Sequence, residues 1–481
     1  MTEIGIHTFV PHYTVAEREA VGRTARQRVP RKRQGQWLAP ADRPDPIELL
    51  LGQEVSRVPG LLPLRHERMG ASAFAFYRGT AIIMASDLAS QPDSGLTVQL
   101  CGDAHLSNFG LYAAPDRVPV FDLNDFDETH PGPFEWDVKR LAASFVLAAR
   151  DSSYGDVIAR SAARDAAAQY RQSMAQYAGM NEIDIWYDRI DASSMEQWAR
   201  TNTKQFNLKA MQKSFDRAQQ RTMWTAVSKL TTYVDGHRRF LDQPPVLVRV
   251  PEDTMARTMM MEALDQYFDS LAPDRRAVLQ RYEVVDFGHK VVGVGSVGLV
   301  AWVLLLEGRD DSDVLVLQIK QAQKSVLEPY TDVADYSNQG QRVVEGQRII
   351  QAASDPFLGW LTGKLGREYY VRQLRDMKWS PEPSALLPQG LINYARLCGH
   401  VLARAHARSG DAVAISSYMG ESTNFEAAIA DFSLIYADLV AHDFELFQEA
   451  VASGRLMGGS ASEQMDDYLE AFRNPAAYPV Q

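Results

Sequence analysis

The chain has 481 residues, of which 46% are hydrophobic and 23% are charged, which predicts a soluble globular protein of two lobes or more. Its formal net charge of −11 argues against nucleic acid as a partner, because binding a phosphate backbone needs a basic surface. Its 2 cysteines exclude a disulfide framework and a cysteine-ligated zinc site. The first residues carry no signal pattern, and no apolar run reaches the roughly 20 residues that span a bilayer. We therefore expect a cytoplasmic protein with no membrane partner, while nothing in the sequence indicates the oligomeric state.

Two features are notable before residue 90. Asp45-Pro46 begins a predicted helix, since aspartate caps a helix and proline suits its first turn. The apolar stretch from Leu61 to Ala89 carries arginines among its aromatic residues, and an arginine in such surroundings needs a partner. Either these arginines pair with nearby acids or their planar guanidinium groups bind phosphate. Arg68 and Arg78 are therefore candidates for contacts to a phosphate or to another part of a substrate.

The stretch from residue 96 to 137 contains a dense group of Asp, Asn and Glu side chains, whose oxygens could bind a metal ion. An apolar run over Leu96–Leu100 predicts a short buried strand that ends at the tight pair Gly102-Asp103, and Asn108 follows. A second predicted strand, Val118–Phe121, is followed by a cluster of acids: Asp122, Asp125, Asp127 and Glu128. Carboxylates and an amide at two strand ends suit a hard divalent cation, and one carboxylate is left to take a proton from a hydroxyl. The alternative is two surface turns, in which Asp and Asn are common.

Beyond residue 137 the predicted structure changes twice. Residues 138–280 have helical periodicity almost throughout. From Tyr282, β-branched and apolar residues alternate between turns rich in glycine and aspartate, which predicts successive antiparallel strands. The further predicted elements are a helix over 335–353, a strand from Arg367, a helix over 388–408 and helices to Phe472.

A second candidate site begins with a GxGxxG motif formed by Gly293, Gly295 and Gly298. A dinucleotide-binding fingerprint would need a helix directly after these glycines, because the N-terminus of that helix holds the pyrophosphate. Here AWVLLLEG and then GRDDSD follow, which predict a strand and a turn. The motif is therefore predicted to be a glycine-rich hairpin whose backbone amides can approach phosphate groups.

The return strand of this hairpin, LVLQIK, ends at Lys320. A lysine at this place would supply a point charge to the phosphates of a nucleotide, although a strand lysine taken singly more often reaches solvent. Glu345, on the following predicted helix, is expected to pair with Lys320, and Glu328 is a weaker candidate for that role.

The stretch CGDAHLSNFG and the acids after it resemble the catalytic and metal-binding segments of the aminoglycoside phosphotransferase and choline kinase branch of the protein-kinase-like superfamily. In that branch a His-Gly-Asp precedes a metal-binding Asn, and a strand ending in Asp and a helix beginning with Asp follow. The resemblance implies that Asp103 is catalytic and that Asn108 and Asp122 bind the metal, with Asp125 as a competitor for the role of Asp122. It also implies that Asp137 braces the catalytic loop.

The resemblance extends to the glycine motif. It implies that Gly293, Gly295 and Gly298 cover the phosphates, that Lys320 binds them and that Glu345 fixes the lysine. Two departures stand against it: Cys101 replaces the histidine, and the glycine motif comes about 190 residues after the catalytic loop instead of before it.

A circular permutation would reconcile this order with the family, since chain termini are often close together in space. The helix HVLARAH, ending at His406, resembles the one that normally leads into the catalytic loop. The unpermuted alternative places that loop at Gly410-Asp411-Ala412, but Ser416 stands where the Asn is needed.

The fold class expected from the resemblance is α+β, namely a circularly permuted two-lobed kinase-like fold with a small antiparallel sheet lobe and a large helical lobe. The expected parts are a helical part over 1–280 that includes the catalytic and metal-binding segment (about 96–137), a β-rich part over 281–385 and a helical part over 386–481. With RMGASAFAFYRG and HARSGD beside CGDAHLSNFG, the whole chain also resembles an uncharacterised bacterial family known only as a domain of unknown function.

The resemblance to kinases implies an ATP- and Mg²⁺-dependent phosphotransferase that transfers phosphate to a hydroxyl of an unknown small molecule or protein. Asp103 would orient and deprotonate the acceptor hydroxyl, while Asn108 and Asp122 hold Mg²⁺ against the nucleotide. Two alternatives stay open: a nucleotide-binding regulatory protein without catalysis, and transfer of the AMP moiety by the same residues.

Overall fold

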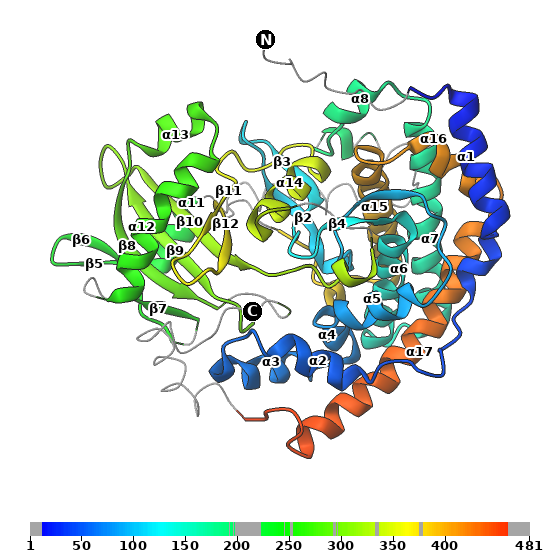
Figure 1. Cartoon of the computed structure of the whole chain (residues 1–481), viewed down its shortest axis with the longest axis horizontal. Helices are drawn as coiled ribbons and strands as arrows, with labels where there is room; N and C mark the ends of the chain where they lie inside the picture. Colours follow the sequence, from blue (N-terminus) through cyan, green and yellow to red (C-terminus); the bar gives the residue numbers. More distant parts are fainter. Residues whose placement is uncertain are drawn as a thin grey trace, which may run out of the picture.

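The computed structural model describes residues 12–191, 193–195, 197, 223–244, 246–250, 254–291, 295, 297–331, 336–374 and 379–459. The fold is α+β, with a large helical part beside a smaller part built on an antiparallel sheet (Figure 1). The two halves of the helical part come from opposite ends of the sequence, and the β-rich part lies between them in the chain. None of the helices in the described part of the chain is both long and apolar enough to cross a membrane.

The helical part is held together by a core of long helices. The most extensively buried of them is α6 (Phe134–Asp151), and it packs with α7 (Gly155–Tyr177) and α17 (Asn424–Ala452). α15 (Pro388–Ala407) lies along α7, which joins the C-terminal segment to the N-terminal half. The other helices of this part are α1 (Val15–Arg28), α2 (Pro46–Glu54), α3 (Leu62–Met69), α4 (Ala73–Arg78), α5 (Ala81–Ala89), α8 (Glu182–Tyr187) and α16 (Ala412–Met419). The predicted start of α2 is confirmed, because Asp45 caps the helix and Pro46 is its first residue.

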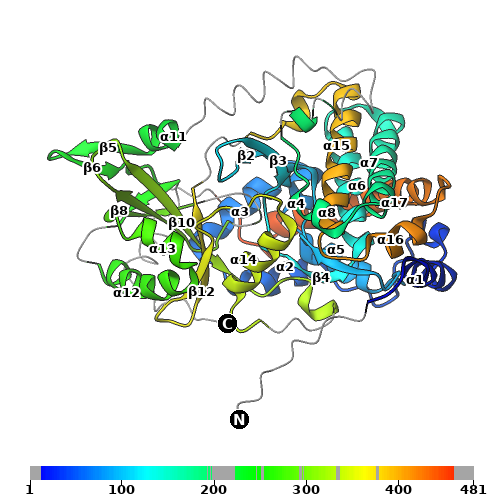
Figure 2. The ribbon, with the colours of Figure 1, turned by 90° about the horizontal axis from the view of Figure 1, so that it is seen from above.

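Two small two-stranded sheets lie where the helical part meets the β-rich part (Figure 2). β1 (Thr97–Leu100) pairs with β4 (His130–Pro133), and β2 (Phe109–Ala113) pairs with β3 (Pro119–Leu123), both antiparallel. The strands predicted around residues 96–100 and 118–121 are therefore present. β4 has no sequence signal, because its four residues HPGP include no β-branched or aromatic strand former.

The β-rich part is a six-stranded antiparallel sheet with the order β11-β12-β10-β9-β8-β7. Its strands are β7 (Leu247–Arg249), β8 (Glu283–Lys290), β9 (Ala301–Glu307), β10 (Val314–Ala322), β11 (Gly359–Thr362) and β12 (Glu368–Gln373). α14 (Gln339–Ile350) follows β10 in the chain, and η4 (Glu328–Tyr330) lies between them. The strands predicted from Tyr282 and from Arg367 and the helices predicted over 335–353 and 388–408 are confirmed.

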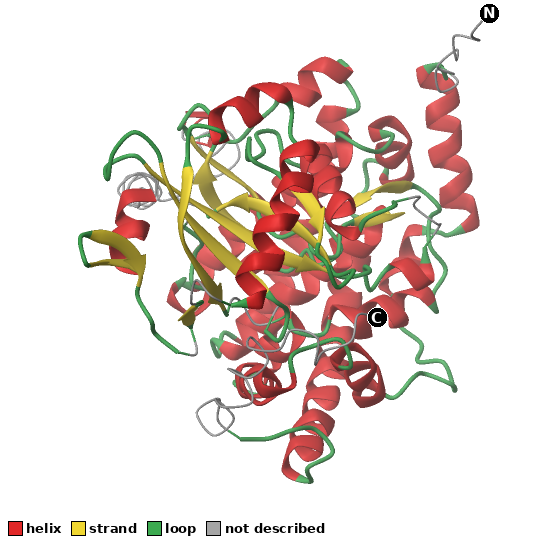
Figure 3. Cartoon of the chain, turned by 60° about the vertical axis from the view of Figure 1, so that its left-hand side comes forward, coloured by secondary structure: helices red, strands yellow, loops and turns green. Residues whose placement is uncertain are grey.

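Side chains alternate along β10 between two hydrophobic cores. Figure 3 shows helices packed beside this sheet. Leu315, Leu317 and Ile319 pack with α12 (Met255–Ser270), whereas Val316 packs with Phe240. Phe240 belongs to the hairpin of β5 (Thr231–Val234) and β6 (His237–Phe240), which lies beside α11 (Met223–Leu230). α13 (Pro273–Leu279) completes this part.

The expectation of helices almost throughout 138–280 is wrong for the residues that form β5, β6 and β7. β7 pairs with β8, so the sheet begins before residue 281, where the β-rich part was expected to start. These strands are three or four residues long and carry arginines, as in HRRF and LVR, so they lack the alternation that marks a strand.

Candidate active site

A cavity of about 190 Å³ lies between the two parts of the molecule and is lined by residues of both. Acidic, basic and amide side chains dominate its lining: Asp103, Asn108, Asn124, Asp125, Asp127 and Glu128, with Arg57, Arg78, His105 and Arg372. Gly295 lies at its edge. A larger cavity of about 290 Å³ near α14 and β2 contains none of the predicted site residues, so the chemistry is concentrated in the smaller one.

The loop that leaves β1 is braced by Asp137 on α6. The carboxylate of Asp137 accepts hydrogen bonds from the backbone N–H groups of Cys101 (2.8 Å) and Gly102 (3.2 Å). Gly102 has φ +82°, and a Cβ there would lie 2.1 Å from the carbonyl oxygen of Glu128, so only glycine fits. His406, at the end of α15, places Nε2 3.3 Å from Asp137 Oδ2. The structure thus gives Asp137 the place that the resemblance implied.

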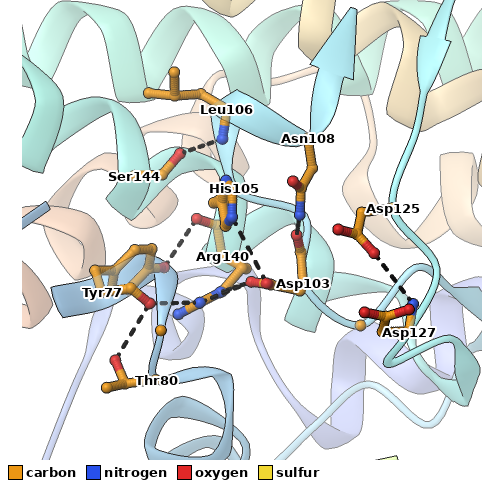
Figure 4. A network of polar contacts seen from close by, with 12 residues as sticks. Tyr77, Thr80, Asp103, His105, Leu106, Asn108, Asp125, Asp127, Arg140 and Ser144 are labelled. Atoms are coloured by element: carbon orange, nitrogen blue, oxygen red, sulfur yellow. Dashed lines mark hydrogen bonds and ion pairs between the residues drawn. The ribbon is translucent and has the colours of Figure 1, made fainter. Parts of the chain in front are cut away.

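Asp103 presents its two carboxylate oxygens to different surroundings (Figure 4). Arg140 donates from Nε (2.9 Å) and from a terminal nitrogen (2.7 Å) to Oδ1 alone. Oδ2 lies 3.6 Å from His105 Nε2, which is too far for a hydrogen bond. Burial lowers the pKa of His105 to about 3, so its ring is neutral near neutral pH. Oδ2 of Asp103 is therefore available to a ligand hydroxyl.

Arg140 is itself fixed against α4. Its guanidinium lies 3.8 Å from the centroid of the Tyr77 ring and donates to the Tyr77 carbonyl oxygen at 2.7 Å. The Tyr77 hydroxyl donates in return to the Arg140 carbonyl oxygen at 2.9 Å. Because both partners are buried, the orientation of Asp103 depends on packing between α4 and α6.

Asn108 follows the same loop and has an oxygen suited to a hard cation. Its Nδ2 donates to the Asp103 carbonyl oxygen at 2.8 Å, so its Oδ1 points away from that bond. Asp125 lines the cavity beside it. Carboxylate and amide oxygens are ligands that Mg²⁺ accepts together with water and phosphate oxygens. Among the described residues no three His, Cys, Asp or Glu side chains form a metal site by themselves. Asn108 and Asp125 are two oxygen-bearing residues of the cavity that could bind such an ion.

Asp122, the acid favoured by the resemblance, lies elsewhere. It is 3% exposed, does not line the cavity and forms an ion pair of 2.6 Å with Arg404 on α15. Burial raises the pKa of Asp122, and the charge of Arg404 opposes that rise. We therefore correct the predicted metal set: Asp122 is a residue of the protein interior, and Asp125 is the acid that reaches the cavity. The reason is the register of β3, which ends at Leu123 and leaves Asp125 in the loop beyond.

Lys320 approaches the same acidic segment, but its partner differs from the predicted one. Lys320 is 2% exposed and forms an ion pair with Asp127, whose other oxygen accepts from the Tyr370 hydroxyl at 2.8 Å. Burial alone would lower the pKa of Lys320, but the charge of Asp127 raises it. Glu345 instead accepts from Gln341 one turn earlier on α14, at 2.7 Å. The expected Lys320–Glu345 pair is therefore replaced by a pair between Lys320 and Asp127.

This difference leads to a direct test. Asp127→Asn should weaken binding of Mg·ATP by about tenfold, because it removes the countercharge that holds a buried lysine in place. Glu345→Gln should change the same dissociation constant by less than about twofold, since its hydrogen bond to Gln341 does not involve the lysine. Isothermal titration calorimetry on both variants measures this. A stronger effect at Glu345 would restore the predicted pair.

The glycine segment is only partly described, and Gly293 lies outside the described residues. Gly298 has φ +91° and accepts a hydrogen bond of 2.8 Å from the Val58 N–H. The Arg57 side chain packs on Gly298, where a Cβ would lie 3.0 Å from it. The turn after β8 therefore lies against the segment that precedes α3.

A comparison with known protein families finds one family that covers most of the chain, including the cavity. A family model described as "Uncharacterized protein conserved in bacteria (DUF2252)" matches residues 57–450. The chain belongs to this family. No curated protein matches it, and no solved structure does. The DUF2252 match begins at Arg57 and includes every cavity-lining residue named above.

Two other predicted positions in this DUF2252 protein lie outside the cavity lining. Arg68 is at the end of α3 and does not line the cavity, whereas Arg78 does, so only Arg78 is retained. The unpermuted alternative also fails on position: Asp411 caps α16 through the Ala414 N–H at 3.0 Å and does not line the cavity either.

Several cavity or supporting residues were not predicted, among them His105, Arg140, Arg57 and Arg372. His105 lies within the loop already singled out, and Arg140 is three residues beyond Asp137, which places it on the same face of α6. The positions of these two residues relative to Asp103 and Asp137 could therefore have predicted that they lie near the site. Arg57 and Arg372 had none, because each is a single arginine in a stretch with no motif, and only the folded chain brings them together.

Proposed function

We propose that this chain is an ATP- and Mg²⁺-dependent phosphotransferase that acts on a hydroxyl group. The observation that carries the proposal is the meeting of two distant segments: Lys320 of β10 contacts Asp127, next to a cavity lined by Asp103, Asn108 and Asp125. A phosphotransferase needs this combination of cations, metal ligands and a free carboxylate at one place.

The sheet supports the same proposal. β8, β9 and β10 are successive antiparallel strands; the glycine segment joins the first two, the lysine lies on the third, and α14 follows. In protein kinases a glycine-rich loop covers the phosphates and the lysine lies on the third strand.

The end of α15 supports the permuted order. The Gln99 N–H donates to Ser409 Oγ at 3.0 Å, and His406 contacts the aspartate that braces the loop after β1. The helix that resembles the one before a kinase catalytic loop therefore ends beside that loop, although residues 101–108 come some 300 positions earlier in the chain. A circular permutation that opens the chain between this helix and the loop after β1 would keep the contacts of a kinase-like core.

In the proposed reaction, the acceptor hydroxyl donates its hydrogen bond to Asp103 Oδ2. As its oxygen bonds to the γ-phosphorus, the bond from that phosphorus to the bridging oxygen breaks and the proton passes to Asp103. Arg140 keeps Oδ1 occupied, so Oδ2 is the oxygen presented to the acceptor. Asn108 and Asp125 would hold Mg²⁺, which neutralises charge on the phosphates when bound.

The decisive experiment follows the fate of ATP labelled at the α or the γ phosphorus, with Mg²⁺ and a cell extract depleted of nucleotides as the source of acceptor. Transfer of γ-label alone supports the proposal. Transfer of α-label alone would replace it with AMP transfer by the same residues. Tight ATP binding with neither label transferred would leave a regulatory nucleotide-binding protein. Asp103→Asn protein is the matched control for label carried by other enzymes.

A further inference from the structure

Two arginines that precede the loop of Asp103 in the chain line the cavity, and each has a buried Nε with no hydrogen-bond partner among the described residues. Arg57 is 4% exposed and donates at 2.6 Å to the Val297 carbonyl oxygen, but its Nε has no partner among the described residues. Arg78 is the last residue of α4, and its buried Nε likewise has no partner in the described part of the chain. Both side chains line the cavity. The hydrogen-bonding capacity of both guanidinium groups is therefore only partly used within the described part of the chain.

Neither arginine forms an ion pair with a carboxylate of the described residues, although the charges of Glu128 and Asp127 act on Arg57 and that of Glu382 acts on Arg78. Glu54, the acid nearest in sequence to Arg57, pairs with Arg65 at 2.6 Å and with His66 at 2.6 Å. Burial, followed by the charge of Arg65, lowers the pKa of Arg57 well below its ordinary value. Asp103, whose charge acts on Arg78, already receives both donors of Arg140. Burying a guanidinium without a countercharge is costly, so a bound anion would stabilise this arrangement.

Gly295 and Gly298 each lie against one of these two arginines. A Cβ at Gly295 would be 3.4 Å from the Arg78 carbonyl oxygen, and Gly298 packs on the Arg57 side chain. An anion bound in the cavity beside Gly295 and Gly298 would thus contact both guanidinium groups. Lys320 cannot take the same role unaided, because Asp127 already neutralises it.

We propose that Arg57 and Arg78 form an arginine clamp that binds the polyphosphate chain of the donor nucleotide and supplies more of its countercharge than Lys320 does. This inference rests on the proposed function and deepens it. Two planar guanidinium groups suit this ligand, because each can donate two hydrogen bonds to one phosphate.

The test uses the full chain and two probes, Mg·ATP and inorganic tripolyphosphate, measured by calorimetry. Arg78→Gln should raise the dissociation constant of both probes at least tenfold, and the Arg57→Gln/Arg78→Gln double variant should bind neither. Arg164→Gln removes one positive charge from an exposed position on α7 and should change both constants less than twofold. Arg57→Lys keeps the charge if Arg57→Gln does not fold, and should weaken both probes about threefold or more.

The outcomes separate the clamp from the proposed function. If the wild type binds tripolyphosphate and Arg78→Gln does not, while labelled ATP gives no product, the clamp stands and the phosphotransferase does not. If the wild type transfers γ-label and Arg78→Gln binds both probes as tightly as Arg164→Gln does, the clamp is wrong and the function stands. Failure of the wild type to bind tripolyphosphate also overturns the clamp.

Discussion

Asp103→Asn is expected to lower kcat by about 10²–10⁴-fold, the range for loss of a general base, while the dissociation constant for Mg·ATP changes less than about threefold. Asparagine has nearly the same shape as aspartate but cannot accept the proton of the acceptor hydroxyl. The nucleotide is held by other groups in the cavity, so its affinity should persist. Single-turnover kinetics with γ-labelled ATP and calorimetry give the two values separately.

The control for this variant is Arg140→Gln, which removes the partner of Asp103 but leaves the carboxylate. It should also lower kcat, by a smaller factor, because Asp103 loses the contact that fixes Oδ1. An Asp103→Asn protein that turns over at the wild-type rate would remove Asp103 from the mechanism.

The second large effect distinguishes two aspartates three residues apart. Asp125→Asn should weaken Mg²⁺ activation at least tenfold and leave stability within about 1 kcal/mol, because Asp125 lines the cavity. Asp122→Asn should leave Mg²⁺ activation nearly unchanged and lower the stability of the fold. It leaves Arg404 buried without its countercharge, which costs about 3–5 kcal/mol of unfolding free energy. Metal titrations of activity and urea denaturation of both variants give the comparison.

A matched variant checks the second half of that prediction. Arg404→Met breaks the same pair from the other side and should be destabilised to a similar degree, because Asp122 would then be the buried charge left alone. If the Asp122→Asn variant were as stable as the wild type but no longer activated by Mg²⁺, the assignment of Asp125 would be wrong and Asp122 would be the metal ligand. That result would also place the end of β3 differently from the structure described above.

Local sequence was enough to predict the loop from Asp103 to Asn108, because both residues and the turn before them lie within one short motif. The strands β8 to β10 also followed from local alternation, whereas the α+β class was implied by the resemblance. The choice between Asp122 and Asp125 did not, since it depends on where a strand ends, and a shift of one residue there exchanges the buried and exposed faces.

Contacts between distant segments were the least predictable part. The partner of Lys320 was expected on the next helix, but Asp127, 193 positions away, forms the pair. Local spacing on α14 instead gives Glu345 a neighbour at i−4, Gln341. Arg57 and Arg372 show the same limit, because a single arginine carries no signal until the chain has folded around it.

The contacts between the loop after β1 and the end of α15 have a consequence for how the protein folds during synthesis. The hydrogen bond from Gln99 to Ser409 joins residues 310 positions apart, and His406 reaches Asp137 over a similar separation. On the ribosome, the loop that carries Asp103 is therefore synthesised long before the helix that supports it. Contacts of such long range slow folding and leave partly folded chains exposed. A nascent chain that has not yet reached α15 has Asp103 and Asn108 in its sequence but lacks this support for their loop.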